Sequence, residues 1–296
     1  MGSVTRVVGA VVIAAGATIG VRKFLDRNQI GDPQQWMRTN HRDEPISLLE
    51  GPSVAAGAAA GSLIAGSPYC AERAAQVVAT LGAGAFGLYD DLKEDTSTRA
   101  KGLSGHLAAF REGTLTTGGL KVLGIGASAF VASVFTNTGK PGRNVFDVFL
   151  DAAAIAGAAN LMNLLDLRPG RALKVTIAAG ALLTLSGRSA GGPLLGAAAA
   201  AWNGDLQERD MLGDCGANAL GALVGTAFTQ NTHRGTRVLG VAGIVGLTLA
   251  SERVSFSQVI VQTPWLNTVD MLGRRPAQET QSAPTVNEQD SEEPRP

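Results

Sequence analysis

Long apolar stretches alternate with short charged segments along most of the chain. Many of these stretches are about 17 to 22 residues long, the length that an α-helix needs to cross the hydrocarbon core of a bilayer. The pattern therefore predicts nine membrane-spanning helices. They are expected at 4–21, 51–67, 73–89, 114–135, 144–164, 172–187, 190–204, 213–230 and 235–251.

Composition supports the same class of protein. Hydrophobic residues make up 45% of the 296-residue chain, charged residues only 17%, and 38 residues are glycine. A soluble protein of this length would show polar faces on its helices, whereas alanine and glycine suit a membrane bundle because they let helix backbones approach closely. We therefore expect an all-α, polytopic integral membrane protein. The helical bundle covers 1–274, and a disordered cytoplasmic tail with few apolar residues covers 275–296.

The first apolar stretch has two interpretations. A basic residue, Arg6, in front of an apolar run is also the pattern of a cleaved signal peptide. The cleavage pattern after the run is poor, however, and Arg22, Lys23 and Arg27 follow it directly. Basic residues in that position are typical of a cytoplasmic anchor, so a retained helix is the favoured interpretation.

The distribution of Lys and Arg predicts the orientation. With the N-terminus outside, 18 of the 25 basic residues fall in cytoplasmic segments and seven fall outside. Because cytoplasmic loops carry the excess of basic residues, we expect a multi-pass protein of the cell inner (plasma) membrane, N-terminus outside and C-terminus cytoplasmic. Cys70 and Cys215 then lie on opposite sides and do not pair. The net charge of zero gives no basis for nucleic-acid binding.

Polar residues collect at the helix ends that this orientation places on the cytoplasmic face. Asp90 and Asp91 follow the third predicted helix. Asn163 and Asp166 lie at the end of the fifth, and Asp214 begins the eighth. Ionisable groups near the membrane are costly unless they are paired, solvated or bound to a cation, so they are candidate functional residues.

The chemistry of these residues suits a phosphate-handling site. The adjacent carboxylates at positions 90 and 91 repel each other, and Mg²⁺, which favours oxygen ligands together with substrate phosphates, relieves that repulsion. Asn163 and Asp166 are three positions apart and share a helix face. Such a site predicts phosphoryl transfer between a nucleotide-linked donor and a lipid phosphate. The basic residues expected to meet phosphate oxygens are Lys93, Arg99, Lys101, Arg168 and Arg171.

Four motifs, taken in order, resemble the polyprenyl-phosphate N-acetylhexosamine-1-phosphate transferases. This family includes the MraY-type phospho-MurNAc-pentapeptide transferase and the WecA- and TagO-like enzymes. The resemblance runs from about residue 36 to about residue 230, and all four motifs fall on the predicted cytoplasmic face. The motifs lie at 38–52, at 90–91 followed by 101–105, at 160–166 and at 213–221.

The resemblance implies about ten transmembrane helices, so nine to ten are expected, together with a Mg²⁺-dependent cytoplasmic site. It implies transfer of a sugar-1-phosphate from a UDP-sugar to a polyprenyl phosphate in cell-envelope glycan synthesis, with release of UMP. It leaves a homodimer open. The implied catalytic residues are Asp90, Asp91 and Asp166, the implied metal ligands are Asp214 and Asp91, and the implied substrate-binding residues are Asn163, Lys93, Lys101, Arg38 and Asn40.

The chain departs from the family's pattern at three places. Lys93 is one position earlier than the lysine that follows the family's aspartate pair, and Pro169 stands where the family has a further aspartate. The family's late histidine-rich loop is missing, since the three histidines are His41, His106 and His233. The alternative hypothesis is therefore a catalytically silent paralogue that acts as a scaffold or regulator of envelope assembly.

Each motif also has a purely structural interpretation. The pair Asp90 and Asp91 can cap a loop, Asn160 and Asn163 can hydrogen-bond between helices, and Asp214 can cap a helix N-terminus. The basic loops can bind anionic lipid head groups only. A transporter or channel is a third functional class, which is disfavoured because the chain has no internal inverted repeat.

Overall fold

The computed structural model describes residues 3–93 and 116–276. Within these ranges the chain is helical apart from one short hairpin and the connections, so the all-α prediction is confirmed. The helices are α1 (Ser3–Asn28), η1 (Pro33–Trp36), α2 (Glu50–Ala65), α3 (Cys70–Lys93), α5 (Thr117–Asn137), α6 (Val145–Leu165), α7 (Arg171–Leu185), α8 (Gly191–Leu206), α9 (Gly213–Asn231), α10 (Arg234–Ser251), α11 (Phe256–Gln262) and α12 (Pro264–Met271).

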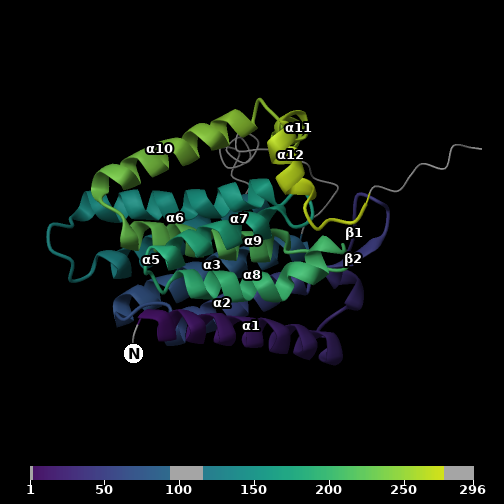
Figure 1. The fold of residues 1–296 in the computed structure, drawn as a ribbon, viewed down its shortest axis with the longest axis horizontal. Coiled ribbons are helices and arrows are strands. Elements are labelled where there is room, and N and C mark those ends of the chain that lie inside the picture. Colours follow the sequence, from purple (N-terminus) through teal and green to yellow (C-terminus); the bar gives the residue numbers. More distant parts are fainter. Residues whose placement is uncertain (1–2, 94–115, 277–296) are drawn as a thin grey trace, which may run out of the picture.

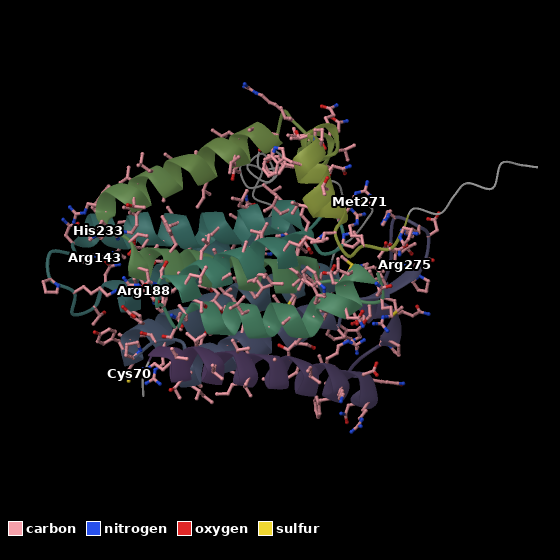
Figure 2. All side chains as sticks on the ribbon, viewed as in Figure 1. Cys70, Arg143, Arg188, His233, Met271 and Arg275 are labelled. Atoms are coloured by element: carbon pink, nitrogen blue, oxygen red, sulfur yellow. The ribbon has the colours of Figure 1, made fainter. Side chains whose placement is uncertain are left out.

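The helices from α1 to α10 lie side by side along the long axis of the molecule (Figure 1). One of them covers each of the nine apolar stretches predicted from the sequence. Two strands, β1 (Met37–Thr39) and β2 (Pro45–Ser47), form an antiparallel hairpin at one end of the bundle. We call this end the hairpin end; the opposite end carries Cys70 and His233 (Figure 2).

Three of the described helices are long and apolar enough to cross a membrane: α1, α5 and α6. A fourth span is obtained if α10 and α11, which meet at a bend of 92°, are counted as one broken helix. The remaining helices are short, as α2, α7 and α8 are with 15 or 16 residues, or less apolar. The fold therefore has the apolar helices of a membrane protein, while the count of nine to ten spans stays a prediction.

Helix α9 lies at the centre of the bundle and packs against α2, α3 and α6. Most of its side chains are buried, and they are small. A Cβ on Gly225 would lie 2.8 Å from the backbone of Ile155 in α6, so only glycine permits this approach. Small residues thus bring the backbones of α6 and α9 together, as expected for helices that pack in a membrane.

Helix α1 packs against α2 and α8 through the same type of contact. A Cβ on Gly57 of α2 would lie 2.6 Å from the carbonyl oxygen of Ala14. One on Gly196 of α8 would lie 2.9 Å from the Ala14 side chain. The first apolar stretch is therefore an integral helix of the bundle.

A buried ion-pair network joins α6 to α10 at the end opposite the hairpin. Arg237 of α10 donates hydrogen bonds to both Asp147, at 2.8 Å, and Asp151. Arg143 also pairs with Asp151 at 2.9 Å, and Arg234 pairs with Asp147. Both aspartates are fully buried. Each buried carboxylate therefore has a cationic partner, which offsets its desolvation and fixes α10 on α6.

Candidate functional site

Five connections and helix ends meet at the hairpin end. They are the hairpin, the C-terminus of α3, the N-terminus of α5, the α6–α7 connection and the α8–α9 connection. The hairpin contacts α3 through Arg38, which donates to the backbone carbonyl of Asp91. It contacts the α8–α9 connection through backbone bonds of Ser47 with Arg209 and Met211, at 3.1 and 2.8 Å. The predicted cytoplasmic segments with polar motifs are thereby gathered at one end.

An ion cluster of two carboxylates and one ammonium group lies between α3, α5 and α9. The Lys121 ammonium is 2.7 Å from Asp90 Oδ2 and 2.5 Å from Asp214 Oδ2. Two aspartates that are 124 positions apart in sequence numbering therefore point their carboxylates at one cation. The arrangement supports a preference for positive charge at this point, because the two carboxylates repel each other without it.

Asp91 points into the bundle, toward the first turn of α9. Its two carboxylate oxygens accept hydrogen bonds from the backbone amides of Asp214, at 3.0 Å, and Cys215, at 2.9 Å. These amides have no partner within the helix, and the positive end of the helix dipole favours a carboxylate there. Asp91 thus caps α9 from another helix, a role that the predictions for this residue did not include.

Gly87 lies one turn before this capping contact and lets α3 approach α9. A Cβ at this position would lie 2.6 Å from the carbonyl carbon of Asp214 and 2.8 Å from the amide nitrogen of Cys215. Such overlap would push α3 outward along with the residues of its last turn. The glycine therefore sets how closely Asp90 and Asp91 lie to the start of α9.

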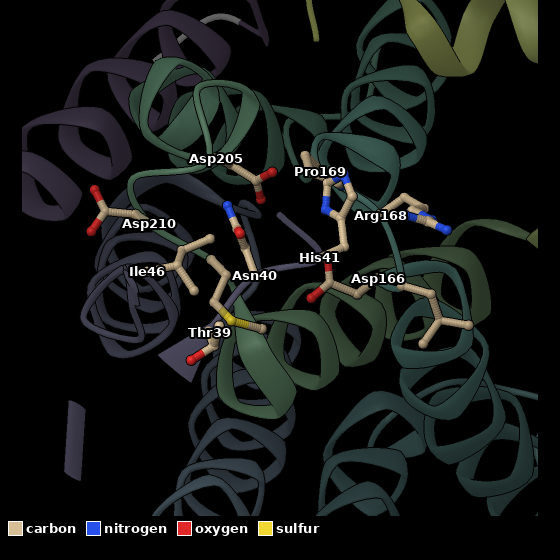
Figure 3. A pocket seen from close by; sticks show the side chains of 11 residues that line it. Thr39, Asn40, His41, Ile46, Asp166, Arg168, Pro169, Asp205 and Asp210 are labelled. Atoms are coloured by element: carbon tan, nitrogen blue, oxygen red, sulfur yellow. The ribbon is translucent and has the colours of Figure 1, made fainter. Parts of the chain in front are cut away.

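A pocket of about 180 Å³ lies at the hairpin end of the bundle (Figure 3). One wall is the hairpin, with Asn40, His41 and Ile46. The α6–α7 connection forms a second wall, and its Asp166 and Arg168 line the cavity. Figure 3 shows the side chains of Asp205 and Asp210 opposite these residues. The pocket is therefore lined by charged and polar side chains together with apolar ones.

Asp166 follows the last turn of α6 and lines this pocket. Burial raises the pKa of its carboxyl well above the usual range, and the nearby carboxylates of Asp205, Asp214 and Asp91 raise it further. Such a shift favours the protonated form of the carboxyl, which is able to donate a hydrogen bond. Asn163 lies one turn earlier, and its carbonyl oxygen accepts from the backbone amide of Asp166 at 3.2 Å.

A second acidic group lies between α2 and α8. Glu50 is 3% exposed, and its Oε1 atom has no hydrogen-bond partner among the described residues. Burial raises its pKa well above the usual range, and the carboxylate of Asp205 adds to this effect. Burial likewise raises the pKa of Asp205 to about 6. Asp205 also accepts a hydrogen bond from the backbone amide of Gly170 at 2.5 Å, which by itself lowers the pKa. Arg22 pairs with Asp210 at 2.7 Å.

The structure brings together part of the set of residues predicted from the sequence. Asp90 and Asp214 share one cation. Arg38, on β1, contacts the end of α3 at the backbone carbonyl of Asp91. Asn40 lines the pocket and donates to Glu208 at 2.9 Å. Lys93, by contrast, is exposed at the end of α3. Arg99, Lys101 and His106 lie outside the described residues.

Lys121 and Glu50 were not among the residues that the sequence predicted for the site. For Lys121 a signal existed, because a lysine inside an apolar helix is costly unless it has a partner. For Glu50 the signal was weak, since a glutamate at the start of a helix is usually a favourable and solvated first-turn residue.

The residues at the ion cluster fit a Mg²⁺ ion in their donor chemistry. Among the described residues, no group of three or more His, Cys, Asp or Glu side chains is arranged to hold a metal ion. Mg²⁺ is often bound by only one or two carboxylates, together with water and substrate phosphates. Asp90 and Asp214 supply two such carboxylates around a point that already favours a cation. An ion bound there would share or take the place of the Lys121 ammonium.

Comparison of the chain with protein-family models gave no match, and comparison with curated protein sequences gave none either.

Proposed function

We propose that this protein transfers a sugar-1-phosphate from a UDP-sugar to a polyprenyl phosphate at the cytoplasmic face of the inner membrane, in a Mg²⁺-dependent reaction. The observation that carries the proposal is the convergence of Asp90 and Asp214, from α3 and α9, on the single cation of Lys121. The pocket beside the hairpin supports it, because charged side chains such as Asp166 and Arg168 line it.

The reaction joins two phosphates. An oxygen of the lipid phosphate attacks the β-phosphorus of the UDP-sugar, and the bond from that phosphorus to the oxygen of UMP breaks. UMP leaves with the electron pair. When bound, Mg²⁺ supplies charge neutralisation for the phosphate oxygens, which is the main requirement of phosphoryl transfer.

Each residue of the site has a proposed role in this reaction. Asp90 and Asp214 would hold the cation, and Lys121 would pair with a phosphate oxygen of the substrate. Asp166, which lines the pocket, forms a hydrogen bond with the UDP-sugar. Asn40 contributes to the pocket for the nucleotide part of the donor. Asp91 positions Asp214 by capping α9, and the metal-ligand role predicted for it from the sequence is the alternative.

The membrane arrangement is part of the proposal. The hairpin end faces the cytoplasm, and nine to ten helices cross or enter the bilayer with the N-terminus outside and the C-terminus inside. The polyprenyl chain of the acceptor then lies in the membrane, so its phosphate reaches the site from the lipid head-group region. This arrangement requires no movement of the lipid phosphate into the bundle.

The test is UMP release by the purified full-length protein. The reaction contains Mg²⁺, a polyprenyl phosphate and one UDP-sugar from a panel, and UMP is quantified. We expect release that needs both the lipid and Mg²⁺ and that Asp214→Asn abolishes while the protein remains folded. No UMP with any donor would count strongly against a transferase.

A catalytically silent paralogue is the second candidate, and one observation favours it. The Lys121 ammonium already satisfies both carboxylates, so the ion cluster is stable without a metal. This candidate predicts that the protein supports envelope assembly in cells and that Asp214→Asn leaves this support intact. Loss of the cellular function in a variant that is expressed at the normal level would eliminate it.

A further inference from the structure

The last described segment of the chain, residues 270–276, crosses the hairpin end of the bundle. We call it the C-terminal clasp. Its start is fixed on α7, because the buried carboxylate of Asp270 accepts from Arg171 at 2.8 and 3.2 Å. Lys174 donates to the backbone carbonyl of Asp270 at 2.5 Å. The clasp therefore begins at a rigid point of the bundle.

The other end of the clasp is fixed on the hairpin by two reciprocal contacts. The Arg275 guanidinium donates two hydrogen bonds to the Glu44 carboxylate, at 2.5 and 3.1 Å. In the opposite direction, Arg42 donates to the backbone carbonyls of Arg275, at 3.1 Å, and Pro276, at 2.8 Å. Side chains from each segment thus hold the other, and Figure 2 places Arg275 at this end.

These contacts reach the pocket through the turn of the hairpin. The Asn40 side-chain oxygen accepts from the backbone amides of Arg42, at 2.8 Å, and Glu44, at 2.9 Å. Arg42 and Asn40 also share the buried carboxylate of Glu208. Asn40 and His41 line the pocket, whereas Arg42, Glu44 and Arg275 do not. Any movement of Arg42 or Glu44 is therefore transmitted to a pocket wall.

We propose that the C-terminal clasp sets the position of the hairpin and thereby the affinity of the pocket for the nucleotide part of the donor. Glu44, Arg42 and Arg275 are positioning residues in this scheme, since none of them touches the ligand. The inference rests on the proposed function, because it takes the pocket to be the nucleotide site. It goes beyond that function by assigning a role to residues 270–276.

The expected change in nucleotide affinity depends on how exposed the ion pair of Arg275 and Glu44 is. The side chains of Arg275 and Glu44 are about one third exposed, and partly exposed ion pairs are weakened by water and salt. Loss of this pair alone is therefore expected to weaken nucleotide binding by at most about fivefold. Because the pair is one of opposite charges, exchanging the two charges should restore it.

The experiment uses Glu44→Arg, Arg275→Glu and the double variant of the full-length protein in detergent micelles. Arg253→Glu is the matched control, because Arg253 is exposed in the turn after α10 and its side chain forms no hydrogen bond or ion pair with another described residue. Hydrogen–deuterium exchange of the hairpin amides is measured first. Binding of UMP is then titrated, and KM and kcat are determined for any UDP-sugar that is turned over.

We expect faster hairpin exchange, weaker UMP binding and a raised KM with unchanged kcat in both single variants. The double variant should recover all three, and Arg253→Glu should match the wild type. Unchanged hairpin exchange in the single variants would overturn the clasp. Faster exchange with unchanged UMP binding would overturn its effect on the pocket. Failure of the wild type itself to bind UMP would overturn the proposed nucleotide site, and the exchange data would then report on the clasp separately.

Discussion

The capping contact of Asp91 leads to a test that separates a structural role for this residue, as a helix cap, from a chemical role, as a metal ligand. Asp91→Asn keeps the shape of the side chain and removes its charge. The amide oxygen of asparagine accepts only one of the two backbone donors, Asp214 N–H or Cys215 N–H, which lie 3.0 and 2.9 Å from the carboxylate. The other amide then faces an NH₂ group.

The magnitude follows from these two bonds. A hydrogen bond to a charged group contributes about 1.5–3 kcal/mol, and the interaction of a carboxylate with a helix N-terminus adds about 0.3–1 kcal/mol. Burial and the Asp214 carboxylate oppose this gain, since they raise the pKa of Asp91 to about 7. Losing one bond is therefore expected to lower the free energy of unfolding by roughly 1–2 kcal/mol. Asp214→Asn should cost much less, because its carboxylate is partly exposed and an amide oxygen still accepts from Lys121.

The assay is thermal unfolding in one detergent with and without Mg²⁺. We expect Asp91→Asn to unfold at a clearly lower temperature than the wild type and to keep the stabilisation by Mg²⁺. Asp214→Asn and Asp90→Asn should unfold near the wild-type temperature and lose the response to Mg²⁺. The reasoning is refuted if Asp91→Asn has wild-type stability and has lost the Mg²⁺ response, since Asp91 would then be a metal ligand and not a cap.

Three further predictions concern packing, buried charge and pH. Gly87→Ala places a methyl group against the backbone of α9, and overpacking of this kind costs about 1–3 kcal/mol. Gly126→Ala, which meets nothing within 4 Å, is the control; equal unfolding temperatures for the two variants would contradict the close approach of α3. Arg237→Met removes the buried cation that Asp147 and Asp151 share. Because Arg234 and Arg143 still pair with these carboxylates, the expected destabilisation in chemical or thermal unfolding is smaller than the about 3–5 kcal/mol of an uncompensated buried charge; wild-type stability would show that the network does not hold α10. The raised pKa of Asp205, about 6, means that its contribution to stability is complete below about pH 4 and is lost as the pH rises through about 6. Asp205→Asn should therefore be more stable than the wild type at pH 7.5, by on the order of 2–3 kcal/mol, and similar to it at pH 4; an equal difference at both pH values would contradict the assignment.

Helix positions were readily predicted, because they depend on a local property of the chain. The apolar stretches between charged segments correspond to helices from α1 to α10. The composition also anticipated how these helices pack, since the contact of Gly225 with Ile155 needs a residue without a side chain. The number of helices that cross the bilayer does not follow from the apolar pattern, because short helices rich in alanine are only weakly apolar.

The site was predicted in part. Asp90 and Asp214 were singled out because carboxylates at helix ends near a membrane are unusual, and they do face one another across a cation. Lys93 was also singled out, because it follows the aspartate pair in sequence, but it points to solvent at the end of α3. Lys121 takes the position between the carboxylates because it lies on a neighbouring helix and faces inward.

The sequence by itself determined that the chain is a bundle of apolar helices whose polar ends carry carboxylates. The length of an apolar run and the charges that flank it are properties of adjacent residues, and no distant contact is needed to read them. Only the tertiary structure decided that Asp91 caps α9, that Glu50 is buried beside Asp205, and that the C-terminal clasp holds the hairpin. Such pairings depend on the rotation and axial position of helices that are far apart in the chain. A shift of a single helical turn would give each carboxylate a different partner while leaving the pattern of apolar residues unchanged.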